Sequence, residues 1–310
     1  MHWADRIAKE LIEKNPDKEE YVCAAGISPS GSVHIGNFRD IATSLYVVKA
    51  LERQGKKARL LFSWDEFDRL RKVPSNIAKI APDFDKYLGM PYAMIPDPHG
   101  VCASYAEYNE KEFEKSLEEM NIHPDYRYQA KNYTAGKYTE GIIFALKHRK
   151  EIYDVLMKYK TQDSDEGERE SYSPVNVYCD NCMKDTTVVT SVSDDGEQLT
   201  YRCKCCGNEK TVNVRDYHLI KLVWKVDWPM RWGVEGVDFE PGGIDHAAAS
   251  GSYVVASDIA KSILGVTPPS FQGYGWLSIA GMGDMHGRYF GFRRWRTTYL
   301  QMQMLRQRKN

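Results

Sequence analysis

A glycine-rich segment with a single histidine offers the clearest chemistry in this sequence. It spans residues 26–37 and contains three glycines, a Pro-Ser-Gly turn and His34 followed by Ile-Gly-Asn. Glycine has no Cβ, so its backbone can approach a ligand closely, and amides at the start of a helix attract anions. His34 lies beside those amides, where it can donate a hydrogen bond to a phosphate oxygen or a leaving group. The segment indicates a phosphate site, with an ordinary structural turn as the alternative.

Four of the seven cysteines have the spacing of a metal site. Cys179 and Cys182 form one Cys-x-x-Cys pair, and Cys203 and Cys206 form another after twenty intervening residues. Two such pairs complete a tetrahedral four-sulfur shell around one metal ion. Two β-prone segments joined by Asp-Asp-Gly lie between the pairs, so we predict a zinc ribbon whose Zn2+ is structural. Four unrelated buried cysteines are the alternative, and Cys205 is a spare thiol.

Aromatic and charged residues alternate in the second half of the sequence in a pattern suited to an amine. Three tryptophans fall within nine residues from Trp224, with an aspartate and an arginine between them, and Asp245 and His246 follow. A site for a long aliphatic amine needs apolar walls along the stem, aromatic faces near the cation and a carboxylate at its end. Residues 224–246 offer all three, although tryptophans more commonly form an apolar core.

Two strands and a helix are expected to position the glycine-rich segment. Residues 21–25 form an apolar run without helical period, which is typical of a buried strand, and apolar residues recur at helical spacing from Phe38 to Val48. The helix is expected to end near Arg53, and residues 58–64 form a second strand, parallel to the first. This order predicts an α/β fold with a doubly wound parallel sheet, whose ligands bind at the carboxyl ends of the strands.

Acidic residues follow the second strand at such a carboxyl end. Asp65, Glu66 and Asp68 would suit a substrate ammonium, with solvated loop carboxylates as the alternative. Other expected elements are helices over residues 2–14, 112–122 and 141–159 and a polar linker over 161–170. After the ribbon, the central sheet is expected to resume with a strand over residues 219–224.

Composition and charge exclude some classes of protein. The net charge is −1, so a nucleic-acid partner would need a local basic surface rather than a basic chain. No run approaches the ~20 apolar residues of a membrane helix, and the amino terminus lacks the pattern of a signal peptide. We therefore expect a cytoplasmic protein without a membrane partner, in which the crowded cysteines bind metal rather than form disulfides.

Taken together, these motifs resemble the class I lysyl-tRNA synthetases over residues 1–280. The segment 26–37 is similar to the HIGH signature of class I aminoacyl-tRNA synthetases, with Asn37 in the last position. The other similar segments are residues 63–69, the ribbon, residues 224–232 and residues 242–253. The resemblance implies a Rossmann-like enzyme that uses ATP and Mg2+ to form lysyl-adenylate and passes lysine to the acceptor end of tRNA.

The resemblance also implies a set of site residues. His34 and Asn37 would be catalytic, because they would stabilise the ATP triphosphate while the α-phosphate is attacked. The ATP site would comprise Pro29, Ser30, Gly31, His34, Gly36 and Asn37. The lysine site would comprise Gly26, Ser28, Trp224, His246 and Tyr274. To these we add Asp65 and Asp245 as ammonium partners on chemical grounds.

Two departures from that family affect the expected activity. Residues 279–288 stand where the family has a Lys-Met-Ser-Lys-Ser-type loop, and they contain no lysine. Losing one preorganised charge-stabilising group typically costs ~10²–10³ in rate, so adenylate formation is expected to be slow. Residues 281–310 form a basic tail that differs from the helical anticodon-binding domain of the family, which is expected to be absent.

The expected organisation is a catalytic domain interrupted by the ribbon. Its parts are residues 1–170 for the first half, 171–215 for the ribbon, 216–280 for the second half and 281–310 for the tail. Two other functions are compatible with the same motifs. A paralogue could deliver activated lysine to another acceptor, and a non-catalytic remnant could bind nucleotide or RNA.

Overall fold

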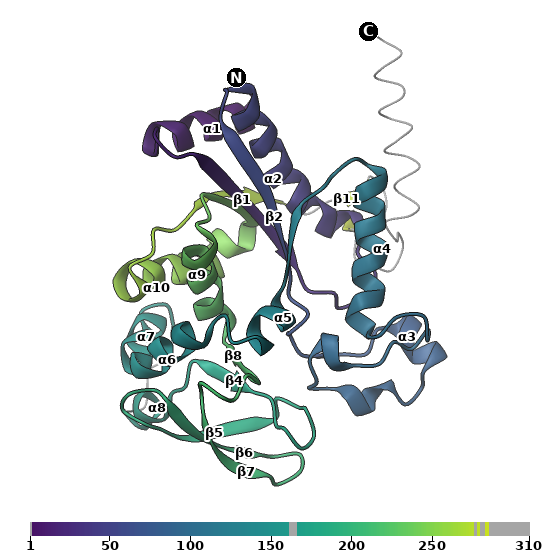
Figure 1. Ribbon diagram of the computed structural model, residues 1–310, viewed down its shortest axis with the longest axis vertical. Coiled ribbons are helices and arrows are strands. Elements are labelled where there is room, and N and C mark those ends of the chain that lie inside the picture. The colour runs from purple at the N-terminus through teal and green to yellow at the C-terminus, as the bar shows by residue number, and fades with distance from the viewer. Residues whose placement is uncertain (1, 161–165, 276–277, 280–282, 285–310) are drawn as a thin grey trace.

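A five-stranded sheet in the order β10-β9-β1-β2-β3, with every pair parallel, lies at the centre of the molecule (Figure 1). The computed structural model describes residues 2–160, 166–275, 278–279 and 283–284. The strands of this sheet are β1 Glu20–Ile27, β2 Lys57–Trp64, β3 Asp125–Tyr128, β9 Phe239–Gly243 and β10 Ser270–Tyr274. The order reverses between β1 and β9, so the predicted doubly wound arrangement is confirmed.

Helices cover both faces of the sheet, and the side chains of β1 alternate between them. The α-helices of the described chain, which do not all contact this sheet, are α1 Trp3–Lys14, α2 Ile35–Arg53, α3 Ser75–Ile80, α4 Tyr105–Glu119, α5 Gln129–Thr134, α6 Thr139–Lys147, α7 Arg149–Met157, α8 Glu166–Ser171, α9 Trp224–Glu235 and α10 Ser252–Ile259. Tyr21, Cys23 and Ala25 pack with α1 and α2, whereas Val22 and Ala24 pack with α9 and α10. Because both faces are covered, all five residues are buried, which explains the continuous apolar run.

The helices differ from expectation in three places. The helix expected over residues 112–122 is α4, which begins earlier because the Ser104 hydroxyl accepts a hydrogen bond from a first-turn amide and caps it. The helix expected over residues 141–159 is divided at His148 into α6 and α7. Part of the expected polar linker is helical, because α8 lies in its second half.

The ribbon is a three-stranded antiparallel sheet, β5-β6-β7, at the end of the long axis opposite α1 (Figure 1). Its strands are β5 Thr187–Val192, β6 Gln198–Cys203 and β7 Glu209–Asn213. The β5–β6 turn requires glycine at Gly196, whose φ is 76° and whose Cβ would lie 2.5 Å from the Ile143 carbonyl oxygen. The third strand has only one buried residue, Val212, so no apolar alternation marks it in the sequence.

The prediction that the central sheet resumes with a strand over residues 219–224 is wrong. Residues 220–222 form β8 (Ile220–Leu222), which pairs antiparallel with β4 (Val175–Val177) in a separate two-stranded sheet. The chain enters and leaves the ribbon through these two strands, so their nearest partners are each other. The central sheet resumes only at β9, after α9.

The remaining elements are short. They are the 3-10 helices η1 Phe84–Tyr87, η2 Tyr92–Met94 and η3 Ile244–Ala247, the π-helix η4 Ala260–Leu264, and the strands β11 Ser278–Ile279 and β12 Gly283–Asp284. Among the described residues, no helix has both the length and the apolar character needed to cross a membrane.

Candidate functional site

A cavity of about 140 Å3 opens beside the carboxyl ends of β1 and β9. These two strands share a single register pair, Cys23 with Phe239, so the sheet parts beyond it. The cavity lies at this parting, where the strand order reverses, which is the usual ligand site of open α/β sheets.

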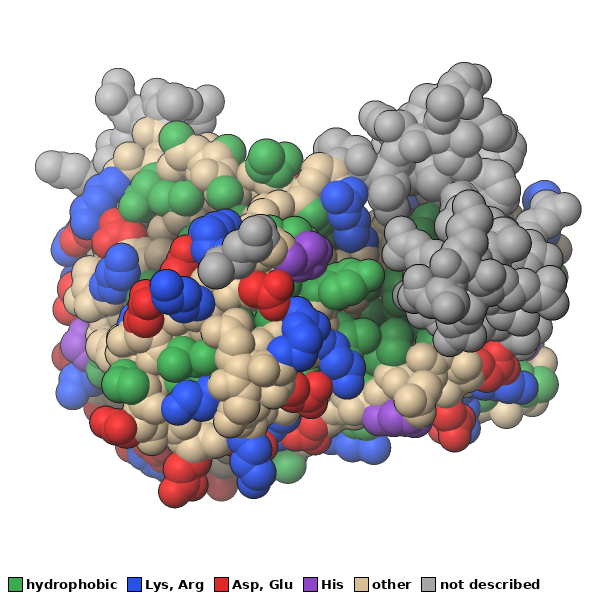
Figure 2. Space-filling view, turned by 90° about the horizontal axis from the view of Figure 1, so that it is seen from above, with side chains coloured by type: hydrophobic (Ala, Val, Ile, Leu, Met, Phe, Trp, Pro, Cys, Tyr) green, Lys and Arg blue, Asp and Glu red, His purple; other side chains and the backbone are tan. Residues whose placement is uncertain are grey.

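The surface charges on one face of the molecule are mixed. The face in Figure 2 is hollowed, and hydrophobic side chains line the hollow. Basic and acidic side chains are interspersed around it, and the described part of this face shows no extended basic area. The local basic surface that a nucleic-acid partner needs is therefore not on the described part of this face.

An acidic residue of α2, Asp40, lines the cavity. Its carboxylate is buried and accepts hydrogen bonds from the Gly26 amide (3.0 Å) and the Tyr274 hydroxyl (2.8 Å). Burial raises the pKa of Asp40 to about 7, although both hydrogen bonds lower it. A cation in the cavity would therefore favour the ionised carboxylate. Gly26 also allows β1 to lie close to β2, because a Cβ at this position would lie 3.0 Å from the Ser63 carbonyl oxygen.

Three tryptophans at four-residue spacing lie along the same side of α9 and line the cavity. The rings of Trp224 and Trp228 stack with centroids 4.9 Å apart, and Trp228 meets His246 edge to face at 5.7 Å. The Trp232 indole donates to Glu240 (2.6 Å), and burial raises the pKa of Glu240 to about 7. Trp228 and Trp232 also belong to the buried core, so the tryptophans serve both packing and the cavity wall.

Asp65 lines the cavity but is already paired. Its Oδ1 lies 2.7 Å from Nη1 of Arg231, and both residues are buried. Burial raises the pKa of Asp65, while the positive charge of Arg231 opposes that change. We had expected Asp65 to meet a substrate ammonium, but its carboxylate is already paired with Arg231. By contrast, Asp40 and Glu240 accept hydrogen bonds from uncharged donors.

The second expected ammonium partner, Asp245, lies outside the cavity lining. It is exposed on η3, whereas its neighbour His246 lines the cavity. A 3-10 turn rotates successive side chains by about 120°, so adjacent residues face different ways.

His34 is the N-cap of α2 and forms a capping box with Asn37. The His34 Nδ1 accepts from the Gly36 amide (3.1 Å), and the Asn37 Oδ1 accepts from the His34 amide (3.4 Å). Burial lowers the pKa of His34, so the ring is neutral near pH 7 and, with Nδ1 as acceptor, carries its proton on Nε2. A Cβ on Gly36 would lie 2.9 Å from this ring. The neutral ring can thus donate from Nε2.

Several predicted residues lie around the glycine-rich loop without lining the cavity. The Ser28 hydroxyl donates to Asp68 (2.9 Å), and the Ser30 carbonyl accepts from the Tyr105 hydroxyl (2.8 Å). The predicted residues that line the cavity are Gly26, Gly36, Asn37, Asp65, Trp224, His246 and Tyr274. The predicted residues outside its lining are Ser28, Pro29, Ser30, Gly31, His34 and Asp245.

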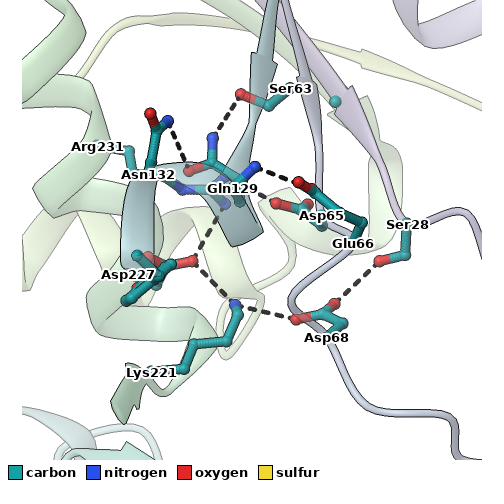
Figure 3. Close-up of polar contacts among 12 residues, drawn as sticks. Ser28, Ser63, Asp65, Glu66, Asp68, Gln129, Asn132, Lys221, Asp227 and Arg231 are labelled. Atoms are coloured by element: carbon teal, nitrogen blue, oxygen red, sulfur yellow. Dashed lines mark hydrogen bonds and ion pairs between the residues drawn. The ribbon is translucent and has the colours of Figure 1, made fainter. Parts of the chain in front are cut away.

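Besides Arg231, which pairs with Asp65, and Glu235, which pairs with Arg127 and Lys137, four polar residues line the cavity without having been predicted: Asp40, Ser63, Gln129 and Glu240. Asp40 had a sequence signal, because it follows Gly36 by four residues on one helix and therefore shares its face. No local pattern marks the others. The Gln129 side chain donates to the Ser63 hydroxyl (3.1 Å) only because β3 pairs with β2 (Figure 3).

The four predicted cysteine ligands converge. Their Sγ atoms all lie within 4.8 Å of one another, with 3.6 Å between Cys179 and Cys206 and between Cys182 and Cys203. A tetrahedron of ~2.3 Å Zn–S bonds separates its sulfurs by about 3.8 Å, so the cluster fits one Zn2+. Cys205 is exposed and is not part of the cluster.

A doubly wound parallel sheet with His-Ile-Gly-Asn at the mouth of its first crossover helix, and a cavity where the strand order reverses, defines a class I aminoacyl-tRNA synthetase. Enzymes of this class use ATP and Mg2+. The family model described as tRNA synthetases class I (K) matches residues 1–306, and the chain belongs to that family.

Curated relatives from bacteria and archaea match most of this chain. Lysine--tRNA ligase of Borrelia garinii subsp. bavariensis is 40% identical over 282 residues, covering 91% of this chain and 53% of the relative. Lysine--tRNA ligase of Treponema pallidum is 39% identical, covering 94% and 55%. Lysine--tRNA ligase of Pyrococcus horikoshii is 39% identical, covering 93% and 54%. The chain thus spans about half the length of these relatives.

Proposed function

We propose that this chain activates lysine with ATP to form lysyl-adenylate and transfers the lysine to tRNA. The cavity supports this proposal, because aromatic faces line one wall and the carboxylates of Asp40 and Glu240 accept, within the described part of the chain, from uncharged donors only. An extended cation suits such a site, since its stem contacts the rings and its ammonium neutralises a carboxylate. The names of the relatives support the same substrate.

The lysine site that we propose combines predicted and newly found residues. It comprises Gly26, Trp224, His246 and Tyr274 from the sequence, with Asp40 and Glu240 from the structure. Ser28, two residues after Gly26, lies outside the cavity lining and donates to Asp68. Asp65 would act indirectly, by holding Arg231 in the cavity wall.

The start of α2 would serve the phosphates. Amides in the first turn of a helix attract anions, and the Nε2–H of His34 is a further donor. Asn37 would hold His34 in place, and the loop residues Pro29, Ser30, Gly31 and Gly36 would lie along the nucleotide. Mg2+ would share the charge of the triphosphate, so the residues of the chain would act mainly by positioning the reactants.

The cysteine cluster would hold one structural Zn2+. Four thiolates complete its shell and leave no position for a substrate. We also propose the division into catalytic residues 1–170 and 216–280, with the ribbon over 171–215 between them.

Lysine-dependent exchange between ATP and pyrophosphate tests the activation step, with lysine binding measured in parallel by calorimetry. Norleucine is the matched control ligand, because it keeps the aliphatic stem of lysine and lacks the side-chain ammonium. We expect lysine to bind and to support exchange, and norleucine to do neither. Equal responses to both amino acids, or no lysine binding, would contradict the proposal.

Binding and rate are measured separately because exchange is expected to be slow. Residues 279–288 contain no lysine, and apart from Ile279, Gly283 and Asp284 they lie outside the described residues. Charging of tRNA with radiolabelled lysine then tests the transfer step. Exchange without charging would favour delivery of lysine to another acceptor.

A further inference from the structure

Three residues at the junction of the ribbon and the catalytic domain contact three consecutive residues of the loop that follows β2. We call the residues that make these contacts the ribbon base: Tyr178, Asp185 and Lys221. The contacts are Tyr178 hydroxyl to Phe67 carbonyl (2.6 Å), Lys221 Nζ to Asp68 Oδ1 (2.9 Å) and Asp185 Oδ2 to Arg69 Nη1 (3.0 Å). Tyr178 immediately precedes Cys179 in the sequence, and Lys221 lies on β8, so the loop is held where the ribbon joins the catalytic domain.

Lys221 connects this base to the glycine-rich loop through one carboxylate. Its ammonium contacts Oδ1 of Asp68, and the other oxygen of Asp68 accepts from the Ser28 hydroxyl at 2.9 Å (Figure 3). Lys221 is only 4% exposed, so water does not compete effectively for its ammonium, whereas the Asp68 side chain is 29% exposed. The two oxygens of Asp68 therefore fix the position of Ser28 relative to the ribbon.

Lys221 also connects to the helix that forms the aromatic wall. Its Nζ lies 3.2 Å from Oδ2 of Asp227 on α9, and Asp227 lies 3.3 Å from Arg231, which holds Asp65 (Figure 3). One ammonium thus contacts a carboxylate of the loop after β2 and a carboxylate of α9, the helix of the aromatic wall.

The charges in this buried cluster make Lys221 hard to replace. Three carboxylates, those of Asp65, Asp68 and Asp227, surround two cations, Lys221 and Arg231. Without Lys221, Arg231 alone would face all three carboxylates. The loss of a partner is most unfavourable for Asp227, which is fully buried, whereas the Asp68 side chain is 29% exposed. Asp68 has no second cation in these ion pairs, so it would turn away or take up a proton, and Ser28 would lose its fixed acceptor.

We propose that Lys221 is a positioning residue, through which the ribbon base fixes Asp68 and Ser28 beside the lysine site. This role rests on the proposed function, because Ser28 matters only if lysine binds beside it. The alternative is an ion pair that stabilises the core and has no effect on the ligand. The two differ in whether Lys221 and Ser28, which do not touch, are coupled in lysine binding.

A double-mutant cycle in the full chain tests this coupling. Lysine dissociation constants are measured by calorimetry for Lys221→Met, Ser28→Ala and the double variant. We expect each single variant to weaken lysine about tenfold and the double variant to be little worse than either, because both interrupt one connection. Additive effects, or lysine affinity unchanged in Lys221→Met, would overturn the inference.

Two further variants keep the result interpretable. Lys210→Met removes a lysine of the ribbon itself, on β7, which pairs with Asp180. This variant should leave lysine affinity unchanged. Where Lys221→Met does not fold, Lys221→Arg retains the buried charge, but its planar head cannot place one nitrogen against both carboxylates. The same cycle with Lys221→Arg should again be non-additive, and additivity would overturn the inference. Absence of lysine binding by the unmodified chain would overturn the proposed function as well, whereas additivity alone would overturn only this role.

Discussion

The Tyr274 hydroxyl donates a hydrogen bond of 2.8 Å to Oδ1 of Asp40, although the two residues are 234 positions apart in the sequence. Tyr274 ends β10 and Asp40 lies in α2, the helix that follows β1, so the bond joins the two halves of the fold at the cavity wall. The Gly26 amide holds the other oxygen of the carboxylate. Asp40 therefore presents to the cavity a carboxylate that is fixed from two sides.

Lysine binding should depend on pH through Asp40. Burial raises the pKa of Asp40 to about 7, above the ordinary value near 4. Between pH 4 and 7 its carboxyl is ionised in the unfolded chain but protonated in the empty folded state, so the stability of the empty folded state falls as the pH rises. A bound ammonium reverses this preference, so binding below pH 7 should release protons and strengthen with pH, by at most about tenfold per unit for each carboxylate, then level off above pH 7.

Calorimetry between pH 5.5 and 8 in buffers of different ionisation enthalpy measures both the affinity and the proton release. Glu240, with a pKa raised to about 7 by burial, contributes in the same range. Asp40→Asn should therefore bind lysine weakly and release fewer protons, while Glu240→Gln retains the release from Asp40. A flat pH profile in the unmodified chain would contradict this prediction.

Replacing Trp224 with alanine should weaken lysine more than ATP. The Trp224 ring is partly exposed, lines the cavity and stacks on Trp228 at 4.9 Å, so its loss removes an aromatic surface from the amino-acid side only. We expect lysine affinity to fall about tenfold or more and ATP affinity to change little. Tyr46→Ala, which removes an exposed aromatic of α2, is the control. Equal weakening of both ligands would contradict the placement of Trp224 in the lysine site.

Gly36→Ala should separate activity from stability. The new Cβ would lie 2.9 Å from the His34 ring, so the ring would turn away and lose its hydrogen bond from the residue-36 amide. Losing this cap costs about 1 kcal/mol, and alanine in place of glycine within the helix regains a similar amount. The free energy of unfolding should therefore change by less than about 1 kcal/mol. Exchange should fall by about 10²-fold if the His34 donor is displaced. Gly275→Ala, whose Cβ would meet none of the described atoms within 4 Å, should alter neither quantity.

Metal analysis should find about one zinc per chain. Cys206→Ser should lose the metal, because it removes one of four converging sulfurs, and should lower the melting temperature. Cys205→Ser is the matched control and should retain the metal, since Cys205 is outside the cluster. Loss of zinc in that control would show that the ligand set is wrong.

The sequence alone determined the features that depend on near neighbours. The strand at residues 21–25, the glycine-rich loop, the helix to Arg53 and the parallel strand that follows are all present as predicted. The four cysteines also converge as their spacing predicted. These features are local because helical period, apolar runs and Cys-x-x-Cys spacing are set within a few residues.

Only the tertiary structure decided which distant groups meet. An apolar run indicates a strand with a buried segment, and residues 220–222 are buried, but the run does not show which strand they pair with. The strand β8 pairs with β4 rather than with the central sheet. In the same way, a carboxylate in the sequence does not reveal its partner: Asp65 meets Arg231, and Asp40 meets Tyr274. Such pairs depend on the order of strands in the sheet, because that order brings residues far apart in the chain to one cavity.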